Sequence, residues 1–195
     1  MTPADSEKDE TIMNIARTSA VALSALAFAT VTYAAKNPIV GGKEMFPNKN
    51  IVENAVNSAD HTTLVTAVKA AGLVETLQGT GPFTVFAPTN AAFQKLPAGT
   101  VDTLLKPENK PTLTKVLTYH VVAGRMSSAD LKKAIKAGKG TAMLKTVSGD
   151  TLWAMMKGND IVLKDAQGGM SLVTQANVFQ SNGVIHVVDT VVLPQ

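Results

Sequence analysis

The sequence predicts an α+β protein, and three observations carry this prediction. Helical patterns fill most of residues 51–138, whereas short apolar runs separated by turn residues fill the chain after residue 140. One strand pattern, residues 83–87, lies among the helices and must join the later sheet. Helices first and strands later favour α+β over the alternating order of an α/β sheet.

The first helices are predicted from apolar spacing and from end signals. Residues 51–56 place their apolar side chains on one helical face. Asp60 can cap a second helix, which carries an apolar stripe and ends at Gly72. A short third helix is expected over residues 73–78, before a glycine-rich turn.

A strand followed by a sharp corner is predicted in the segment GPFTVFAPTNAAFQKLP. Residues 83–87 alternate as a strand does, and Pro88 ends it. Thr89 or Asn90 can then accept hydrogen bonds from the free amides of a helix over residues 91–96. Because the segment contains no Cys, His, Ser or carboxylate, we interpret it as architecture. The alternative is that the corner forms the rim of a ligand site.

The second half of the chain changes from helices to strands. Residues 100–106 and 112–122 are predicted as helices, the latter alternatively as a helix that runs into a strand. Ser127 or Ser128 can cap a further helix, which ends at Gly138. The turn sequences SGD, KGND, AQGG and QSNG then separate runs with hairpin spacing. The predicted strands are residues 141–147, 151–157, 160–165, 171–180 and 183–193.

Composition limits the classes of protein and site. The 195 residues suggest one domain, and 45% hydrophobic and 17% charged residues allow a globular core. The absence of cysteine excludes disulfides, thiolate metal sites, a thiol nucleophile and a lipidated cysteine anchor. The formal net charge is only +3 and the lysines are scattered, so we expect no nucleic-acid partner.

The N-terminus has the pattern of an export signal. Residues 18–35 are uncharged, follow Arg17 and end in small residues, which is typical of a signal peptide over residues 1–34. Because residues 1–12 are acidic, we hypothesise that translation starts at Met13. A buried helix or a retained membrane anchor is the alternative. Cleavage would leave 16 basic and 11 acidic residues, a net charge of +5, and an exported chain that is periplasmic or extracellular.

Behind the signal, residues 35–47 carry prolines and a glycine pair without hydrophobic periodicity, and we interpret them as a linker. The domain is then expected over residues 48–194.

Four segments in this order resemble the fasciclin domain family. FTVFAPTNAAF is similar to the first conserved box of the family, and NGVIHVVDTVVLP to the second. Between them, VLTYHVVAG contains the Tyr-His dipeptide of the family as Tyr119 and His120. The opening segment IVENAVNSADHTTLVTAVKAAGLVETLQG resembles the usual first helices.

The resemblance implies an α+β wedge, a β-sandwich core with helices packed along one side. It also implies an adhesion or protein-interaction module, similar to short, secreted, single-domain bacterial members and to the domains of transforming-growth-factor-β-induced protein. Two departures matter. Membrane-held bacterial relatives use a lipidated cysteine that this chain lacks, so a freely released form is expected. No Arg-Gly-Asp tripeptide is present, so integrin binding is not carried over.

The resemblance links the Tyr-His pair to adhesion, and Tyr119 and His120 are the best polar candidates for a site. Their apolar neighbours favour a structural interpretation, in which both side chains are buried and hydrogen-bonded. His186 and Asp189 are three residues apart on a predicted strand and therefore lie on opposite faces, not as a dyad. The three histidines form no metal-ligand pattern, and neither a metal nor a cofactor is expected.

Two further groups of residues have an open interpretation. One group is a set of lysines on or just after one predicted helix: Lys132, Lys133, Lys136 and Lys139. They form either a solvated face or a contact for an anionic polymer. The second group consists of methionines and the single tryptophan. We interpret it as adaptable core, and the alternative is a groove for a lipid or peptide. It consists of Met143, Trp153, Met155, Met156 and Met170.

The sequence therefore predicts an exported, non-catalytic adhesion or protein-interaction module, and we expect a monomer. Its expected partner is a cell-surface or envelope protein or polysaccharide. The alternative is an extracytoplasmic protein that binds a small ligand or a polysaccharide. An enzyme is disfavoured because no catalytic triad, metal set or pair of acids can be assembled.

Overall fold

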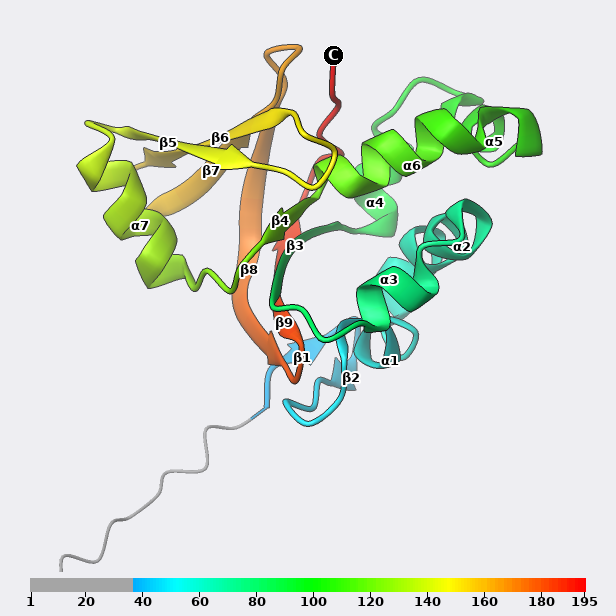
Figure 1. Cartoon of the computed structure of the whole chain (residues 1–195), viewed down its shortest axis with the longest axis horizontal. Coiled ribbons are helices and arrows are strands. Elements are labelled where there is room, and N and C mark those ends of the chain that lie inside the picture. Colours follow the sequence, from blue (N-terminus) through cyan, green and yellow to red (C-terminus); the bar gives the residue numbers. More distant parts are fainter. Residues whose placement is uncertain (1–36) are drawn as a thin grey trace, which may run out of the picture. The chain divides into compact units, whose positions relative to one another are not determined.

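The computed structural model describes residues 37–195, which belong to one compact unit spanning residues 36–195 (Figure 1). The predicted signal peptide and the start at Met13 lie outside the described residues. Every helix within residues 37–195 is too short or too polar to cross a bilayer. The α-helices are α1 (Ile51–Ala55), α2 (Thr62–Ala71), α3 (Val74–Gln78), α4 (Asn90–Gln94), α5 (Thr100–Leu104), α6 (Lys110–Tyr119) and α7 (Ser128–Ala137). Short 3-10 turns, Ala59–His61 and Pro107–Asn109, precede α2 and α6.

The main sheet of the described residues has seven strands in the order β4-β3-β9-β8-β7-β6-β5. All neighbours are antiparallel except β3 and β9, which run parallel with Phe83 opposite Gly183. The fold class is therefore α+β, as predicted. The strands are β3 (Phe83–Pro88), β4 (Val121–Ala123), β5 (Thr141–Lys145), β6 (Thr151–Lys157), β7 (Asp160–Lys164), β8 (Met170–Gln180) and β9 (Gly183–Val188).

The predicted sandwich is one sheet that curls on itself. An isolated bridge joins Val122 of β4 to Thr146 just after β5, which brings the two edges of the sheet together. Phe86 of β3 and Leu152 of β6 consequently share one buried cluster, with Leu131 of α7 packed among them. Helices α1–α6 lie on the other side of β3 and β9 (Figure 1).

Strands β3 and β9 separate two hydrophobic cores. Val85 and Val187 face the cluster that includes α1, α2 and α6, whereas Phe86 and Val188 face the cluster inside the curled sheet. Every residue of β9 is buried, which explains the uninterrupted apolar run in this part of the sequence. The two family-like segments, FTVFA and GVIHVV, are thus paired strands at the centre of the molecule.

The predicted linker is wrong over its described part. β1 (Ile39–Val40) and β2 (Lys43–Glu44) form a two-stranded hairpin. Val40 before its turn and Met45 after it are buried in the core on the helical side. The two strands have only two residues each, and such short segments around a Gly-Gly turn have too little periodicity to predict a hairpin.

The cap predictions hold in part. Thr89 is the N-cap of α4 and accepts from the backbone N–H of Ala92, at 3.2 Å. Ser127 caps α7 in a capping box with Asp130. Asp60 does not cap α2, because it lies within the 3-10 turn that precedes this helix.

Candidate functional site

The hydroxyl group of Tyr119 connects three segments at the end of α6. The side chain is fully buried, and its hydroxyl donates to the carbonyl of Thr151 at 2.8 Å. The same oxygen accepts from the backbone N–H of Ala166 at 3.2 Å. Burial raises the pKa of Tyr119 to about 12, so the hydroxyl keeps its proton at physiological pH. Tyr119 therefore fastens α6 to β6 and to the turn between β7 and β8.

His120 fastens the same end of α6 to the C-terminal segment. Its Nδ1–H donates to the carbonyl of Val116 at 2.8 Å, and Nε2 accepts from the N–H of Val192 at 3.1 Å. Complete burial lowers the pKa of His120 to about 4. Both nitrogens are used by backbone groups, so the neutral ring has no atom left for a substrate or a metal.

Asp165, which the sequence analysis missed, holds the turn beside Tyr119. One carboxylate oxygen accepts from the N–H groups of Gln167 and Gly169, at 3.0 and 2.6 Å. The other accepts from the N–H of Leu193 at 3.0 Å. The signal for this role is an aspartate that directly follows a strand and precedes a Gly-Gly pair by three residues, the pattern of a turn closed by its own side chain.

His186 organises a bulge in β8. Its Nε2–H donates to the carbonyl of Met126 at 2.8 Å, its ring stacks on Phe86, and Nδ1 faces the N–H of Asn177 at 3.4 Å. Burial lowers the pKa of His186. Asn177 has a φ of 63° within an irregular stretch of the β8–β9 register and hydrogen-bonds to Ser128 at the start of α7.

Asn90 has a different role from the predicted one. It does not cap its own helix, because its carbonyl oxygen accepts from the N–H of Thr63 in α2 at 2.9 Å. Its amide group donates to Ala59 and Thr62. Asn90 therefore caps α2 across a tertiary contact, a role that spacing along the chain cannot reveal.

Asp189 lies near Thr89, where the parallel strands β3 and β9 end. The N–H of Thr89 donates to Val188, and Asp189 forms an ion pair with Lys95 at 3.1 Å. Asp189 also accepts from the N–H of Leu172 at 2.8 Å. Burial alone would raise the pKa of Asp189, but these hydrogen bonds and the ammonium of Lys95 lower it.

The predicted site residues thus do not converge on one centre. Tyr119, His120 and His186 are buried and bonded to backbone groups, and His186 and Asp189 have separate partners. Within residues 37–195, no three histidine or acidic side chains gather as a metal site. The buried side chains connect strands, turns and helices to one another.

Among residues 37–195, exposed apolar side chains gather on the outer face of the curled sheet, the side of β5–β8 opposite α7. Opposing residues in antiparallel pairs lie on the same face. The pairs Met143–Trp153, Trp153–Lys164 and Lys164–Met170 therefore place these four side chains in one row. The next row is Thr141, Met155, Val162 and Leu172.

The prediction that the Met and Trp residues form core is wrong for this face. Met143 and Met170 are 71% and 50% exposed, and Trp153 is half-buried. Met156, on the opposite parity of β6, is also exposed. The alternate residues, for example Leu152, form the core beneath, and Met143 and Met170 remain at the surface. Val162, in the second row, is buried.

Two hollows lie on the outer face. One, of about 450 Å³, is lined by Trp153, Met155, Thr141, Lys164 and the turn residues 165–168. The other, of about 470 Å³, reaches from Lys157 and Asp160 to Leu172 and Asp189. Lys145, Lys157 and Lys164 belong to the strand rows of this face, together with the acidic residue Asp160. Two further carboxylates, those of Asp165 and Asp189, belong to the residues that line its hollows.

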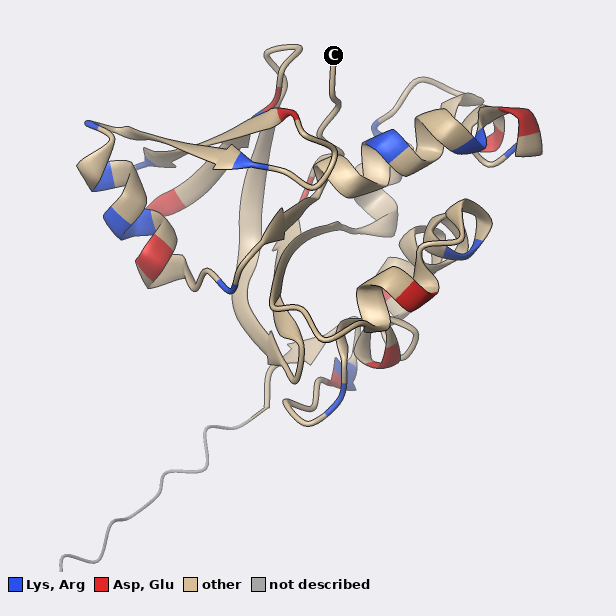
Figure 2. Cartoon of the chain, viewed as in Figure 1, with Lys and Arg blue, Asp and Glu red and all other residues tan. Residues whose placement is uncertain are grey.

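The lysines of α7 form a different surface. Lys132, Lys133 and Lys136 are exposed, whereas Leu131 and Ile135 of the same helix pack into the curled sheet (Figure 2). Lys132 donates to the carbonyl of Asn159 between β6 and β7. Since α7 covers the inner side of β5 and β6, these lysines are separate from the outer face.

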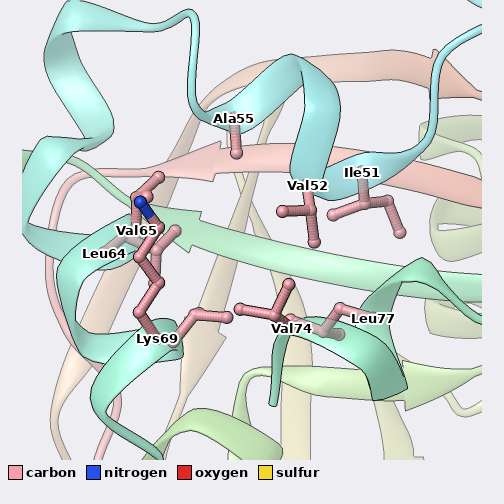
Figure 3. A pocket seen from close by; sticks show the side chains of 9 residues that line it. Ile51, Val52, Ala55, Leu64, Val65, Lys69, Val74 and Leu77 are labelled. Carbon is pink, nitrogen blue, oxygen red and sulfur yellow. The ribbon is translucent and has the colours of Figure 1, made fainter. Parts of the chain in front are cut away.

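An apolar cavity between α1, α2 and α3 offers little space. Side chains of Val52 and Ala55 face those of Val65 and Val74 across it, beside the aliphatic stem of Lys69 (Figure 3). Its volume is about 30 Å³, close to the space of a single water molecule, and all of its lining side chains except Lys69 are apolar. We interpret it as a packing defect between short helices.

The fold and the site define an α+β scaffold in which the prominent polar residues maintain the structure. The chain belongs to the fasciclin domain family, since the family model described as "Fasciclin domain" matches residues 59–194. This match confirms the family predicted from the two boxes and the Tyr-His pair.

Two curated relatives and one solved structure illustrate the similarity. "Protein sll1483" of Synechocystis sp. is 42% identical over 175 residues, which cover 90% of each chain. "Cell surface glycolipoprotein MPB83" of Mycobacterium bovis is 36% identical over 168 residues, 83% of this chain and 69% of the relative. The solved structure is a FAS1 domain pair from the insect cell adhesion molecule Fasciclin I, with a TM-score of 0.66 and 19% identity. The match covers 75% of this chain and about half (51%) of the insect chain, and it supports the fold.

Proposed function

We propose that the protein is an exported, non-catalytic adhesion module that attaches through its outer face to a protein or polysaccharide of the cell surface or envelope. The observation that carries this proposal is the exposure of Met143 and Met170 on either side of Trp153 and Lys164. Exposed apolar side chains that form a continuous patch are typical of interaction sites. Methionine side chains are flexible and adapt to the shape of a partner.

The relatives and the sequence support the same setting. The Mycobacterium bovis relative is named a cell surface glycolipoprotein, and the insect structure comes from a cell adhesion molecule. The pattern of residues 1–34 is that of an export signal. Glycans and envelope proteins are the surfaces that a protein outside the cell membrane contacts first.

The non-catalytic part of the proposal is supported by the hydrogen bonds of the polar candidates. His120 and His186 each direct both ring nitrogens to backbone groups. A general base needs a nitrogen or carboxylate within reach of a substrate proton. Burial keeps both histidines from this role.

The test measures retention of the purified protein on the envelope fraction of the organism, at low and high salt. Replacement of Met143 and Met170 by serine should abolish retention, because it removes the exposed apolar contacts. Val56→Ser is the matched control, since Val56 is 49% exposed but lies at the end of α1. Equal retention of the double variant and the control would contradict the proposal.

A further inference from the structure

We infer that the hollow beside Trp153 on the outer face is a binding site for an acidic sugar, a pyranose ring that carries a carboxylate. The inference rests on the proposed function, because it names the ligand class for the same face. It is carried by the juxtaposition of an indole ring, a lysine that forms no ion pair within residues 37–195, and hydrogen-bonding groups around one hollow. The lining also includes Asp165, whose carboxylate oxygens accept from the backbone N–H groups of Gln167, Gly169 and Leu193.

The floor of the hollow is apolar. Trp153 and Met155 are two residues apart on β6, so both side chains point to the outer face. Both are half-buried, and Thr141 lies directly opposite Met155 on β5. A pyranose ring presents C–H groups on its faces, and an indole is a large apolar surface that such a face can cover.

A cation lies within this apolar row. Lys164 is directly opposite Trp153 and next to Met170, rather than at the border of the patch. Among residues 37–195, no carboxylate forms an ion pair with Lys164, and it is exposed. Covering it with an apolar surface would leave a buried ammonium without a partner, which is costly. A ligand for this site must therefore bring an anionic group to the centre of the face.

Further hydrogen-bonding groups surround the hollow. The carbonyl oxygen of the Gln167 side chain, the indole N–H of Trp153 and the hydroxyl of Thr141 have no hydrogen-bond partner within the described residues. The amide nitrogen of Gln167 is bonded to the carbonyl of Pro194, which fixes the side chain at the rim. Ring hydroxyls can both donate to and accept from groups of these types.

The hollow has a stable frame and a suitable size. Asp165 closes the turn that forms one wall, and the hydroxyl of Tyr119 accepts from Ala166 in that turn. The volume of about 450 Å³ lies in the range of roughly 300–1,000 Å³ that is typical of small-ligand sites. Apolar ring faces, hydroxyls and one carboxylate per ring are the chemistry of a uronic acid. We thus prefer an acidic glycan to a protein partner.

The experiment uses the single tryptophan of the chain as the reporter. A trimer of galacturonic acid is titrated into the purified protein at low salt, and the emission of Trp153 is followed. We expect a saturable change in emission that weakens with added salt. Maltotriose, a neutral trisaccharide, and acetate, a carboxylate without a ring, should produce no such change.

Two variants define the site. Lys164→Gln should weaken binding about tenfold or more, because a hydrogen bond to a charged group is lost. Lys136→Gln, an exposed lysine on α7, should leave binding unchanged and serves as the matched control. Trp153→Phe, followed by NMR chemical shifts in place of emission, should weaken binding as well. Melting temperatures of the three variants confirm that each one is folded.

The outcomes separate this inference from the proposed function. No response to the galacturonate trimer, or an equal response to maltotriose, overturns the acidic-sugar site. An equal loss in Lys136→Gln and Lys164→Gln also overturns it, since it indicates general attraction of a polyanion. If a synthetic peptide of alternating Glu and Leu residues binds and the sugar produces no change in emission, the ligand of this face is a protein and the acidic-sugar site is overturned. The proposed function fails only if the Met143 and Met170 variant keeps its envelope retention.

Discussion

The backbone N–H of Val192 donates a hydrogen bond to Nε2 of His120, and the two atoms are 3.1 Å apart. The bond requires an unprotonated Nε2, because a second proton on the ring would face the N–H group. It joins the end of α6 to the segment after β9 inside the fold. The protonation state of one buried side chain therefore affects how well the C-terminal segment is held.

Acid should destabilise the protein through His120. The folded-state pKa of about 4 lies below the ordinary value of 6.5, so the unfolded chain binds a proton that the folded chain does not. The stabilisation is present above pH 6.5 and is lost as the pH falls towards 4, by about 3 kcal/mol. His61 and His186, whose pKa values burial also lowers, change stability in the same direction.

Urea unfolding between pH 4 and pH 8 measures this dependence. His120→Gln is the informative variant, because an amide can donate to Val116 and accept from Val192 without titrating. It should be less stable at pH 7 but show a smaller loss between pH 6.5 and 4. A pH dependence equal to that of the unmodified protein would exclude His120 as its main source.

Removal of the Tyr119 hydroxyl should destabilise the turn between β7 and β8. Tyr119→Phe leaves the carbonyl of Thr151 and the N–H of Ala166 without their partner, at a cost of about 1–3 kcal/mol. Amide hydrogen exchange at Ala166 should accelerate more than exchange at Val192, the partner of the neighbouring His120. Unchanged exchange at Ala166 would contradict this role for the hydroxyl.

The two caps at the corner after β3 should act on different helices. Asn90→Ala should lower the free energy of unfolding by about 1–2 kcal/mol and expose the backbone amide of Thr63 in α2. Thr89→Ala should cost about 1 kcal/mol and expose the amide of Ala92 in α4. Hydrogen exchange at the two amides distinguishes the caps. If Asn90→Ala exposed Ala92 in place of Thr63, the tertiary cap would be refuted.

Local signals in the sequence were sufficient for most elements and for the α+β class. Ser127 and Thr89 are caps whose helices follow directly in the chain, and β5 and β6 are visible in the sequence as short apolar runs bounded by turn residues. The role of Asn90 was not predictable, because its partner Thr63 precedes it by 27 residues on another helix. Spacing rules describe only contacts within one element.

The exposure of the outer face was not predictable either, for a different reason. A strand with Leu152, Trp153, Ala154 and Met155 in succession is apolar on both sides, and such a run is typical of a strand buried on both faces. β9 has the same character and is indeed covered on both faces. Whether a helix covers the second face depends on the path of the whole chain. In this protein α7 covers the inner faces of β5 and β6, and no helix of the described residues covers their outer faces.

The ion pair at the end of β9 should contribute less to stability than the backbone contact of the same carboxylate. The side chains of Lys95 and Asp189 are 51% and 36% exposed, so solvent weakens their attraction. Lys95→Gln and Asp189→Asn should each cost less than about 1 kcal/mol, because the asparagine oxygen can still accept from the N–H of Leu172. Asp189→Ala should lower the free energy of unfolding by about 1–3 kcal/mol more than Asp189→Asn does, since the N–H of Leu172 then loses its acceptor. Urea unfolding of the three variants at pH 7 gives the order of their stabilities. A loss of stability in Lys95→Gln as large as that in Asp189→Ala would show that the ion pair dominates.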